Sequence, residues 1–188
     1  MKADRYEPVS FFINNYIMVE IKYGLFISFV LFIWMIIEYT LLVPNYHELG
    51  SYIGIIAIFI PIAGIYLGIK ERRDKTNFGY ITFKDAFRTG ITITFIIAVL
   101  LVIFTYVYYE YINPNFVNYL AAETEKNLIE RGAGRDEINA VVTIIRYQFS
   151  LNVQIVQQLL FILLGGAAIT IIVSIILKKI RRSKPLEN

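Results

Sequence analysis

Four long stretches of the chain consist of apolar residues and carry almost no charge. They cover residues 23–43, 52–69, 90–109 and 155–177. Each approaches or exceeds the roughly 20 residues that an α-helix needs to cross a hydrocarbon core of about 30 Å. Buried helices of soluble proteins rarely stay apolar on all sides over this length, so the pattern predicts four transmembrane helices. We place these spans at about residues 21–43, 52–69, 88–111 and 154–177.

The segment between the third and fourth spans, about residues 113–152, has a different pattern. Its first part is mainly polar and ends at Gly132 and Gly134, which interrupt a helix. The second part begins at Asp136 as N-cap and has apolar residues at helical spacing. These residues are Ile138, Val141, Val142, Ile145 and Phe149. We expect a two-helix hairpin whose second helix runs on into the fourth span, because no breaker follows Ser150. The apolar stripe needs a partner, which is the membrane surface, the other short helix or another protein.

Two further patterns predict helical segments beside the spans. Residues 9–20 place apolar side chains on one helical face, which indicates an amphipathic segment on the inner membrane surface. Thr82 followed by Asp85 has the spacing of a capping box. We therefore expect a helix from Thr82 to about Tyr111, whose first turns lie at the membrane interface because the helix exceeds the hydrocarbon thickness.

The positive charges are distributed unevenly along the chain. All but four of the 18 Lys and Arg residues lie near the N-terminus, within residues 70–88 or near the C-terminus. The positive-inside rule therefore makes both termini and the loop before the third span cytoplasmic, and the 113–152 hairpin extracytoplasmic. The sequence predicts an all-α, polytopic membrane protein with a single membrane domain over residues 1–188. These charges set topology and attract anionic lipid head groups, so the expected partner is the lipid bilayer and not a nucleic acid.

Small residues form a stripe along the second span. They are Gly50, Gly54, Ala57, Pro61, Gly64 and Gly68, spaced by four and three in turn. The fourth span has a second group that includes Gly165 and Gly166. Helices in lipid associate by close backbone approach at such residues, so we expect both groups to be helix-packing sites. Packing within the chain is the simpler interpretation, and a homo-oligomer contact is the alternative.

Residue types that carry catalysis or hold metals are scarce. The chain has no Cys and one His, at position 47, which excludes thiolate chemistry, disulfides and a two-histidine metal site. No metalloprotease, nucleophile-elbow or phosphate-loop motif is present. We expect no cofactor and no enzymatic activity; a membrane enzyme built on carboxylates alone is the weakest alternative.

A candidate polar site lies at the outer half of the predicted bundle. Glu38 falls inside the first span and Glu110 at the outer end of the third. Gln157 lies near the start of the fourth span, and Arg146 lies one to two turns before the span on the same predicted helical run. Ionisable residues in a span are functional candidates because burying them unpaired is costly. The alternative is an interfacial acid that pairs with Arg146 or is solvated.

The layout resembles a known bacterial membrane family. The relevant stretches are "IKYGL" before the first span, "GYITFKDAFRTG" before the third and "SIILKK" at the end of the fourth. The most specific element is F-x-x-A-F-x-x-G, formed by Phe83, Ala86, Phe87 and Gly90. These features are similar to the family catalogued as domain of unknown function 4199. The resemblance implies a four-helix protein of the bacterial inner membrane and assigns no activity and no functional residue.

Two functions remain open at this point. The absence of catalytic residues and the small-residue and apolar stripes favour an interaction protein or accessory subunit with a membrane-protein partner or a second copy. The polar residues at the outer half favour a small transporter or channel component instead.

Overall fold

The described part of the chain is helical. The computed structural model describes residues 9–42 and 57–179, and for residues 9–17, 41–42 and 76 it gives the backbone alone. The elements are α1 (Val9–Ile37), η1 (Glu38–Leu42), α4 (Phe59–Glu71), η2 (Arg72–Thr76), α5 (Phe83–Val107), η3 (Tyr108–Ile112), α6 (Phe116–Glu130), α7 (Arg135–Gln148) and α8 (Leu151–Leu177). The η elements are single π-helical turns that follow α1, α4 and α5 directly. The all-α class predicted from the sequence is confirmed.

Among the described residues, three helical stretches are long and apolar enough to cross a membrane. They are Met18–Thr40, Phe83–Ile112 and Leu151–Leu177. They correspond to the first, third and fourth predicted spans. The second predicted span lies partly outside the described residues. Its described part, α4, has 13 residues, which is shorter than a full crossing.

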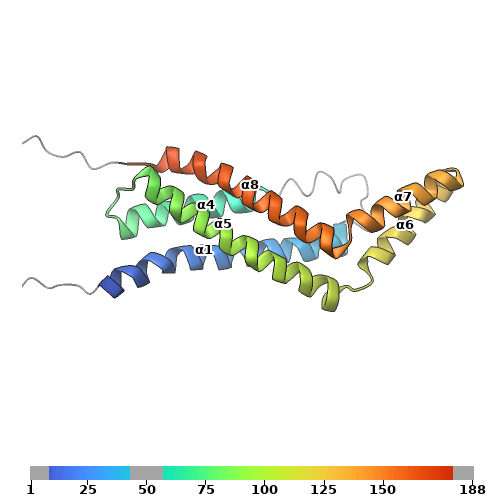
Figure 1. The fold of residues 1–188 in the computed structure, drawn as a ribbon, viewed down its shortest axis with the longest axis horizontal. Helices are drawn as coiled ribbons and strands as arrows, with labels where there is room; N and C mark the ends of the chain where they lie inside the picture. The colour runs from blue at the N-terminus through green and yellow to red at the C-terminus, as the bar shows by residue number, and fades with distance from the viewer. Residues whose placement is uncertain (1–8, 43–56, 180–188) are drawn as a thin grey trace, which may run out of the picture.

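The helix α5 lies at the centre of the bundle. It packs against α1, α4 and α8, and α4 also contacts α1 and α8. A backbone bridge between Ile81 and Lys179 joins the segment before α5 to the end of α8. The helices α6 and α7 lie side by side and project beyond the opposite end of the bundle (Figure 1).

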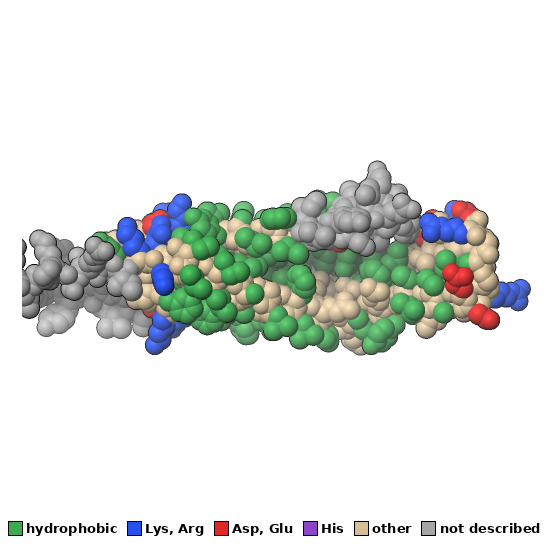
Figure 2. Space-filling model, turned by 90° about the horizontal axis from the view of Figure 1, so that it is seen from above, with side chains coloured by type: hydrophobic (Ala, Val, Ile, Leu, Met, Phe, Trp, Pro, Cys, Tyr) green, Lys and Arg blue, Asp and Glu red, His purple; other side chains and the backbone are tan. Residues whose placement is uncertain are grey.

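The middle of the bundle carries an apolar surface. On the face shown in Figure 2, hydrophobic side chains cover the region between two ends where charged side chains gather. The most exposed large apolar side chains on the long helices include Phe26, Phe95, Phe161 and Leu164. A monomer in water rarely exposes an apolar area of this extent. A surrounding lipid phase accounts for it, as expected of an integral membrane protein.

Small residues sit at the helix contacts. A Cβ atom at Gly64 would meet the side chain of Ile27 on α1, and one at Gly68 would lie 2.6 Å from Ile93 Cδ1 on α5. The stripe on α4 therefore packs within the chain. Ala57 is partly buried against the same core, and Gly54 lies outside the described residues.

The two glycines of α8 differ from each other. A Cβ atom at Gly166 would meet Thr94 of α5, as expected of a packing residue. At Gly165 it would meet no described atom within 4 Å, so that position has open space beside it.

The start of α5 follows the prediction. Thr82 is the N-cap, and its hydroxyl accepts a hydrogen bond from the Asp85 N–H at 3.1 Å. The same hydroxyl donates to the Asp85 carboxylate at 2.7 Å. Because the side chains of a capping box satisfy free groups of the first turn, the helix begins here. The helical run continues through η3 to Ile112.

The end of α7 differs from the prediction. We expected one continuous helix into the fourth span, but the chain bends at Phe149 and Ser150, and Ser150 is extended with φ −65° and ψ 147°. Its hydroxyl donates to the Tyr147 carbonyl, which satisfies a group at the end of α7. The bend lets the Phe149 ring contact Phe116 at 6.0 Å between centroids. The N-cap of α7 is also two residues earlier than expected, at Gly134 and not Asp136, so the helix begins at Arg135.

Candidate functional site

A cavity lies among α1, α4, α5 and α8, in the half of the bundle nearer to α6 and α7. Its volume is about 1020 Å³. Ligand pockets in proteins usually measure about 300–1,000 Å³, so this cavity has room for a sizeable organic molecule. Leu160, Phe161 and Leu164 of α8 line it and are also exposed at the surface. Within the described residues, the cavity is therefore open along α8, on the side where lipid would lie.

The deeper wall of the cavity is apolar. It consists of buried side chains from three helices: Leu31 and Met35 of α1, Ile65 of α4, and Ile97 and Leu101 of α5. Gly165 lines the same space, which explains why a Cβ atom there would meet no neighbour.

The end of the cavity nearer to α6 and α7 is polar. Glu38, the first residue of the π-helical turn η1, lines it together with Gln154, Gln157 and Gln158 of α8. Two of the four predicted site residues, Glu38 and Gln157, are thus brought to one cavity. Single π-helical turns occur often at functional sites, because they shift side chains off the regular helical face.

Two of these amides are held by neighbouring side chains. The Tyr39 hydroxyl donates to Gln154 Oε1 at 2.9 Å, and Gln154 Nε2 donates to the Gln148 carbonyl at 3.0 Å. Thr105 of α5 donates to Gln158 Oε1 at 2.6 Å. Gln157 makes no side-chain hydrogen bond to any residue that the structure describes. Its amide is therefore available to a ligand.

Aromatic packing fixes the region around Glu38. The Tyr39 ring stacks on Phe116 with centroids 4.9 Å apart and planes 5° apart. It also meets the Tyr108 ring edge-on at 5.6 Å. These contacts attach η1 to α6 and η3 and hold Glu38 at the cavity.

The other two predicted site residues lie elsewhere. Glu110 is exposed on η3 and does not line the cavity. Arg146 is exposed on α7, where its guanidinium donates to Asn118 Oδ1 of α6 at 2.7 Å. Within the described residues, no ion pair joins Arg146 to either predicted acid. The bend at Ser150 separates Arg146 from α8, so the prediction of one continuous helical run was wrong.

A second polar cluster, which the sequence analysis did not anticipate, is buried at the opposite end of the bundle. Glu20 of α1 and Arg72 of η2 are only 6% and 2% exposed. The Arg72 Nη1 atom lies 3.7 Å from Glu20 Oε2, and the Thr89 hydroxyl donates to Glu20 Oε1 at 3.1 Å. This cluster joins three helical segments.

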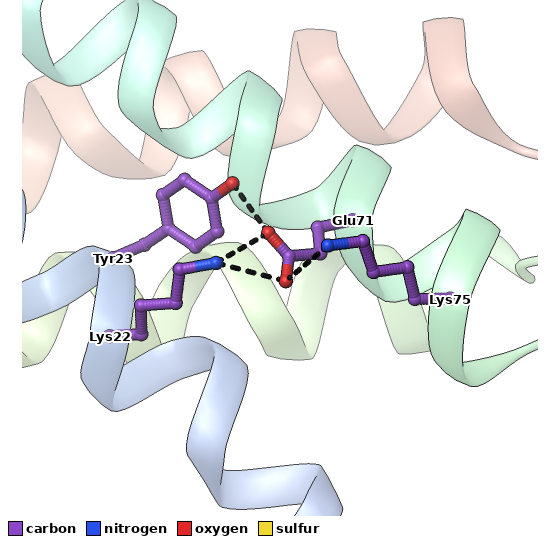
Figure 3. Close-up of polar contacts among 4 residues, drawn as sticks. All are labelled: Lys22, Tyr23, Glu71 and Lys75. Carbon is purple, nitrogen blue, oxygen red and sulfur yellow. Dashed lines mark hydrogen bonds and ion pairs between the residues drawn. The ribbon is translucent and has the colours of Figure 1, made fainter.

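Beside it, Glu71 at the end of α4 accepts hydrogen bonds from three side chains (Figure 3). Lys22 donates to both carboxylate oxygens at 3.0 and 2.8 Å, Tyr23 donates at 2.7 Å, and Lys75 donates at 3.4 Å. The hydrogen bonds from Lys22, followed by the one from Tyr23, lower the pKa of Glu71 from 4.5 to about 2. The predicted topology could have indicated this pairing. Because the first two predicted spans are antiparallel, Lys22 at the start of the first span and Glu71 after the end of the second lie at the same membrane surface.

The comparison with known families gives a clear result. The model of the DUF4199 family, described as a protein of unknown function, matches residues 22–179. The chain belongs to the DUF4199 family. The resemblance found in the sequence is therefore confirmed. Comparisons with curated proteins and with solved structures gave no match.

The region matched by the DUF4199 family includes the whole cavity and the Lys22–Glu71 pair. Within the described residues of this family member, no group of three or more His, Cys, Asp or Glu side chains is placed to hold a metal ion. The described lining of the cavity instead offers one carboxylate, amide groups and aromatic rings beside an apolar wall. This set of groups suits the binding of an organic molecule.

Proposed function

We propose that this DUF4199 protein is a non-enzymatic membrane protein that binds an organic ligand in the cavity, as a component of a transport process. The observation that carries the proposal is the joint placement of Glu38 and Gln157 on one cavity of about 1020 Å³ that is open along α8. An ionisable residue inside a span is costly unless it faces such a cavity and has a task there.

The setting of this cavity follows from the proposed topology. The protein crosses the bacterial inner membrane four times, with both termini cytoplasmic and with α6 and α7 outside. Two observations support this topology: the basic side chains at the bundle end opposite α6 and α7, and the apolar band between the ends (Figure 2). The polar end of the cavity then lies in the outer leaflet.

The experiment that tests the binding function looks for a ligand that accompanies the protein. The protein is extracted gently from its native membrane and measured by native mass spectrometry. We expect a stoichiometric small molecule on the wild type and its loss from Gly165→Trp, because the indole would occupy the open space at that glycine. The matched control is Ile172→Trp, also on α8 but exposed and outside the cavity. A wild type without bound molecule, or equal occupancy in both variants, would contradict the proposal.

A second candidate function is an accessory subunit that binds a membrane-protein partner. It is supported by exposed apolar side chains on α6 and α7, beyond the end of the bundle. These are Tyr119, Ile129, Ile144 and Tyr147. The apolar stripe of α7 supports it less, because Ile145 and Phe149 pack toward α6 and its neighbours. Co-purification of a defined partner that is lost in Ile144→Ser/Tyr147→Ser would support this function, and a solitary monomer would count against it.

A further inference from the structure

The charges around the cavity limit what it can bind. Glu38 is the one Asp, Glu, Lys or Arg among the described residues that line it. The ion pairs formed by the described residues all lie at the opposite end of the bundle, around Glu20, Glu71 and Asp74. A carboxylate at membrane depth is stabilised by a positive counter-charge. Within the described structure that counter-charge does not come from a Lys or Arg side chain, so a ligand can supply it.

Aromatic side chains line the same cavity as the Glu38 carboxylate. Trp34, one helical turn before Glu38, lines the cavity together with Tyr39 and Phe161. The face of an aromatic ring attracts a cation, and the attraction is greatest for Trp and in a site without water. Together with one carboxylate on the same described lining, the aromatic side chains Trp34 and Phe161 therefore favour an organic cation whose charge is diffuse and weakly hydrated.

The rest of the cavity selects for an apolar body. Leu31, Ile65, Ile97 and Leu101 present only hydrocarbon, and burial of apolar ligand surface against them is favourable. A bare metal ion needs several oxygen, nitrogen or sulfur ligands at short distance, and within the described residues no such cluster was found. An anionic lipid would place its charge next to Glu38 and be repelled.

We propose that the ligand of this cavity is a lipophilic organic cation, held by Glu38 at its charge and by the aromatic side chains and the apolar wall at its body. This inference rests on the proposed binding function and specifies its ligand class. The Gln157 carbonyl oxygen, which has no described partner, accepts a hydrogen bond where the cation carries an N–H group.

The test uses two ions of nearly the same size and shape and opposite charge, tetraphenylphosphonium and tetraphenylborate. Binding to the full-length protein in neutral detergent is measured by equilibrium dialysis, with protein-free micelles as the blank. We expect the wild type to bind the phosphonium at least tenfold more tightly than the borate. We expect Glu38→Gln to remove this preference, and Glu110→Gln, an acid outside the cavity, to leave it unchanged.

A second variant tests the same inference if Glu38→Gln folds poorly. Gln157→Glu adds a second carboxylate to the same cavity and should widen the preference for the cation severalfold. A folded wild type that fails to bind the phosphonium, or that binds both ions equally, overturns the cation inference. A preference for the phosphonium over the borate that persists in Glu38→Gln also overturns the inference. A co-purified ligand that is neutral or anionic and is lost in Gly165→Trp would overturn this inference alone and leave the binding function in place.

Discussion

The Lys22 ammonium and the Glu71 carboxylate form an ion pair of 2.8 Å that joins α1 to the end of α4. Lys22 is the first residue matched by the family model, and Glu71 directly precedes the π-helical turn η2. The Tyr23 hydroxyl donates to the same carboxylate. Next to this pair, Glu20 and Arg72 form a buried one. The bundle end opposite the cavity is thus connected by charged groups from α1, α4 and η2.

The Glu71 contacts predict how stability depends on pH. The pKa of Glu71 in the folded protein, about 2, lies below its ordinary value of 4.5. The ionised carboxylate therefore stabilises the fold above about pH 4.5, and this contribution is lost as the pH falls toward 2. Because Lys22 is largely exposed and solvent screens the pair, we expect Glu71→Gln to cost only about 0.5–1 kcal/mol at neutral pH.

Thermal unfolding in detergent between pH 2 and pH 7 measures this effect. The difference in melting temperature between wild type and Glu71→Gln should be present at neutral pH and should shrink in acid. The control is Glu130→Gln, an exposed acid on α6. A difference that stays constant down to the acid limit would contradict this assignment of the carboxylate.

Replacement of Glu20 should be more damaging than replacement of Glu71. Glu20→Ala leaves the buried Arg72 guanidinium without its carboxylate neighbour and the Thr89 hydroxyl without its acceptor. Loss of one partner of a buried ion pair typically costs about 3–5 kcal/mol. Denaturant titration of secondary structure would show this as a lower midpoint. A midpoint shift no larger than that of Glu71→Gln would argue against a buried pair.

The two adjacent glycines of α8 offer a matched comparison of packing. Gly166→Ala should destabilise the bundle by about 1–3 kcal/mol, because the new methyl group would meet Thr94. Gly165→Ala should be neutral or stabilising, since its Cβ meets open space and Ala is the better helix former. The double variant Gly166→Ala/Thr94→Ala should recover much of the loss. Equal melting temperatures for the two single variants would contradict the contact between α5 and α8.

The proposed orientation can be tested without background labelling, because the chain contains no cysteine. We expect Asn139→Cys on α7 to react with a membrane-impermeant maleimide in spheroplasts. Lys84→Cys in the first turn of α5 should react only after permeabilisation. Both positions are exposed, so access alone decides the outcome. The reverse pattern would show that the topology is the opposite of the proposed one. Labelling of both cysteines in spheroplasts would rule out a membrane crossing between the two positions.

The position of each residue along the bundle axis could be predicted from the sequence, because it follows from the order and length of the apolar runs. Three spans, the Thr82 cap and the packing of Gly64, Gly68 and Gly166 follow from such one-dimensional patterns. The rotation of each helix about its own axis, which decides which side chains face the cavity, could not be predicted. Glu38 and Glu110 were assigned similar depths, but of the two only Glu38 lines the cavity. Each residue lies within a π-helical turn, which shifts side chains off the regular helical face.

Two other features depend on contacts between distant segments. The Glu20–Arg72 pair spans two helices, and in the sequence both residues look like ordinary flanking charges. The bend at Ser150 depends on the space beside Phe116 that the Phe149 ring fills, which no local breaker marks. Both are consequences of tertiary packing that overrides local preference.

The central claim, a ligand-accessible cavity within the bundle, is tested most directly by two cysteines on one helix. Met35 and Ile27 are both buried on α1, but only Met35 lines the cavity. In isolated membranes, a small methanethiosulfonate reagent should label Met35→Cys readily and Ile27→Cys hardly at all. Addition of Gly165→Trp should then slow the labelling of Met35→Cys. Equal rates at both positions, or no effect of the tryptophan, would contradict an open cavity at this place.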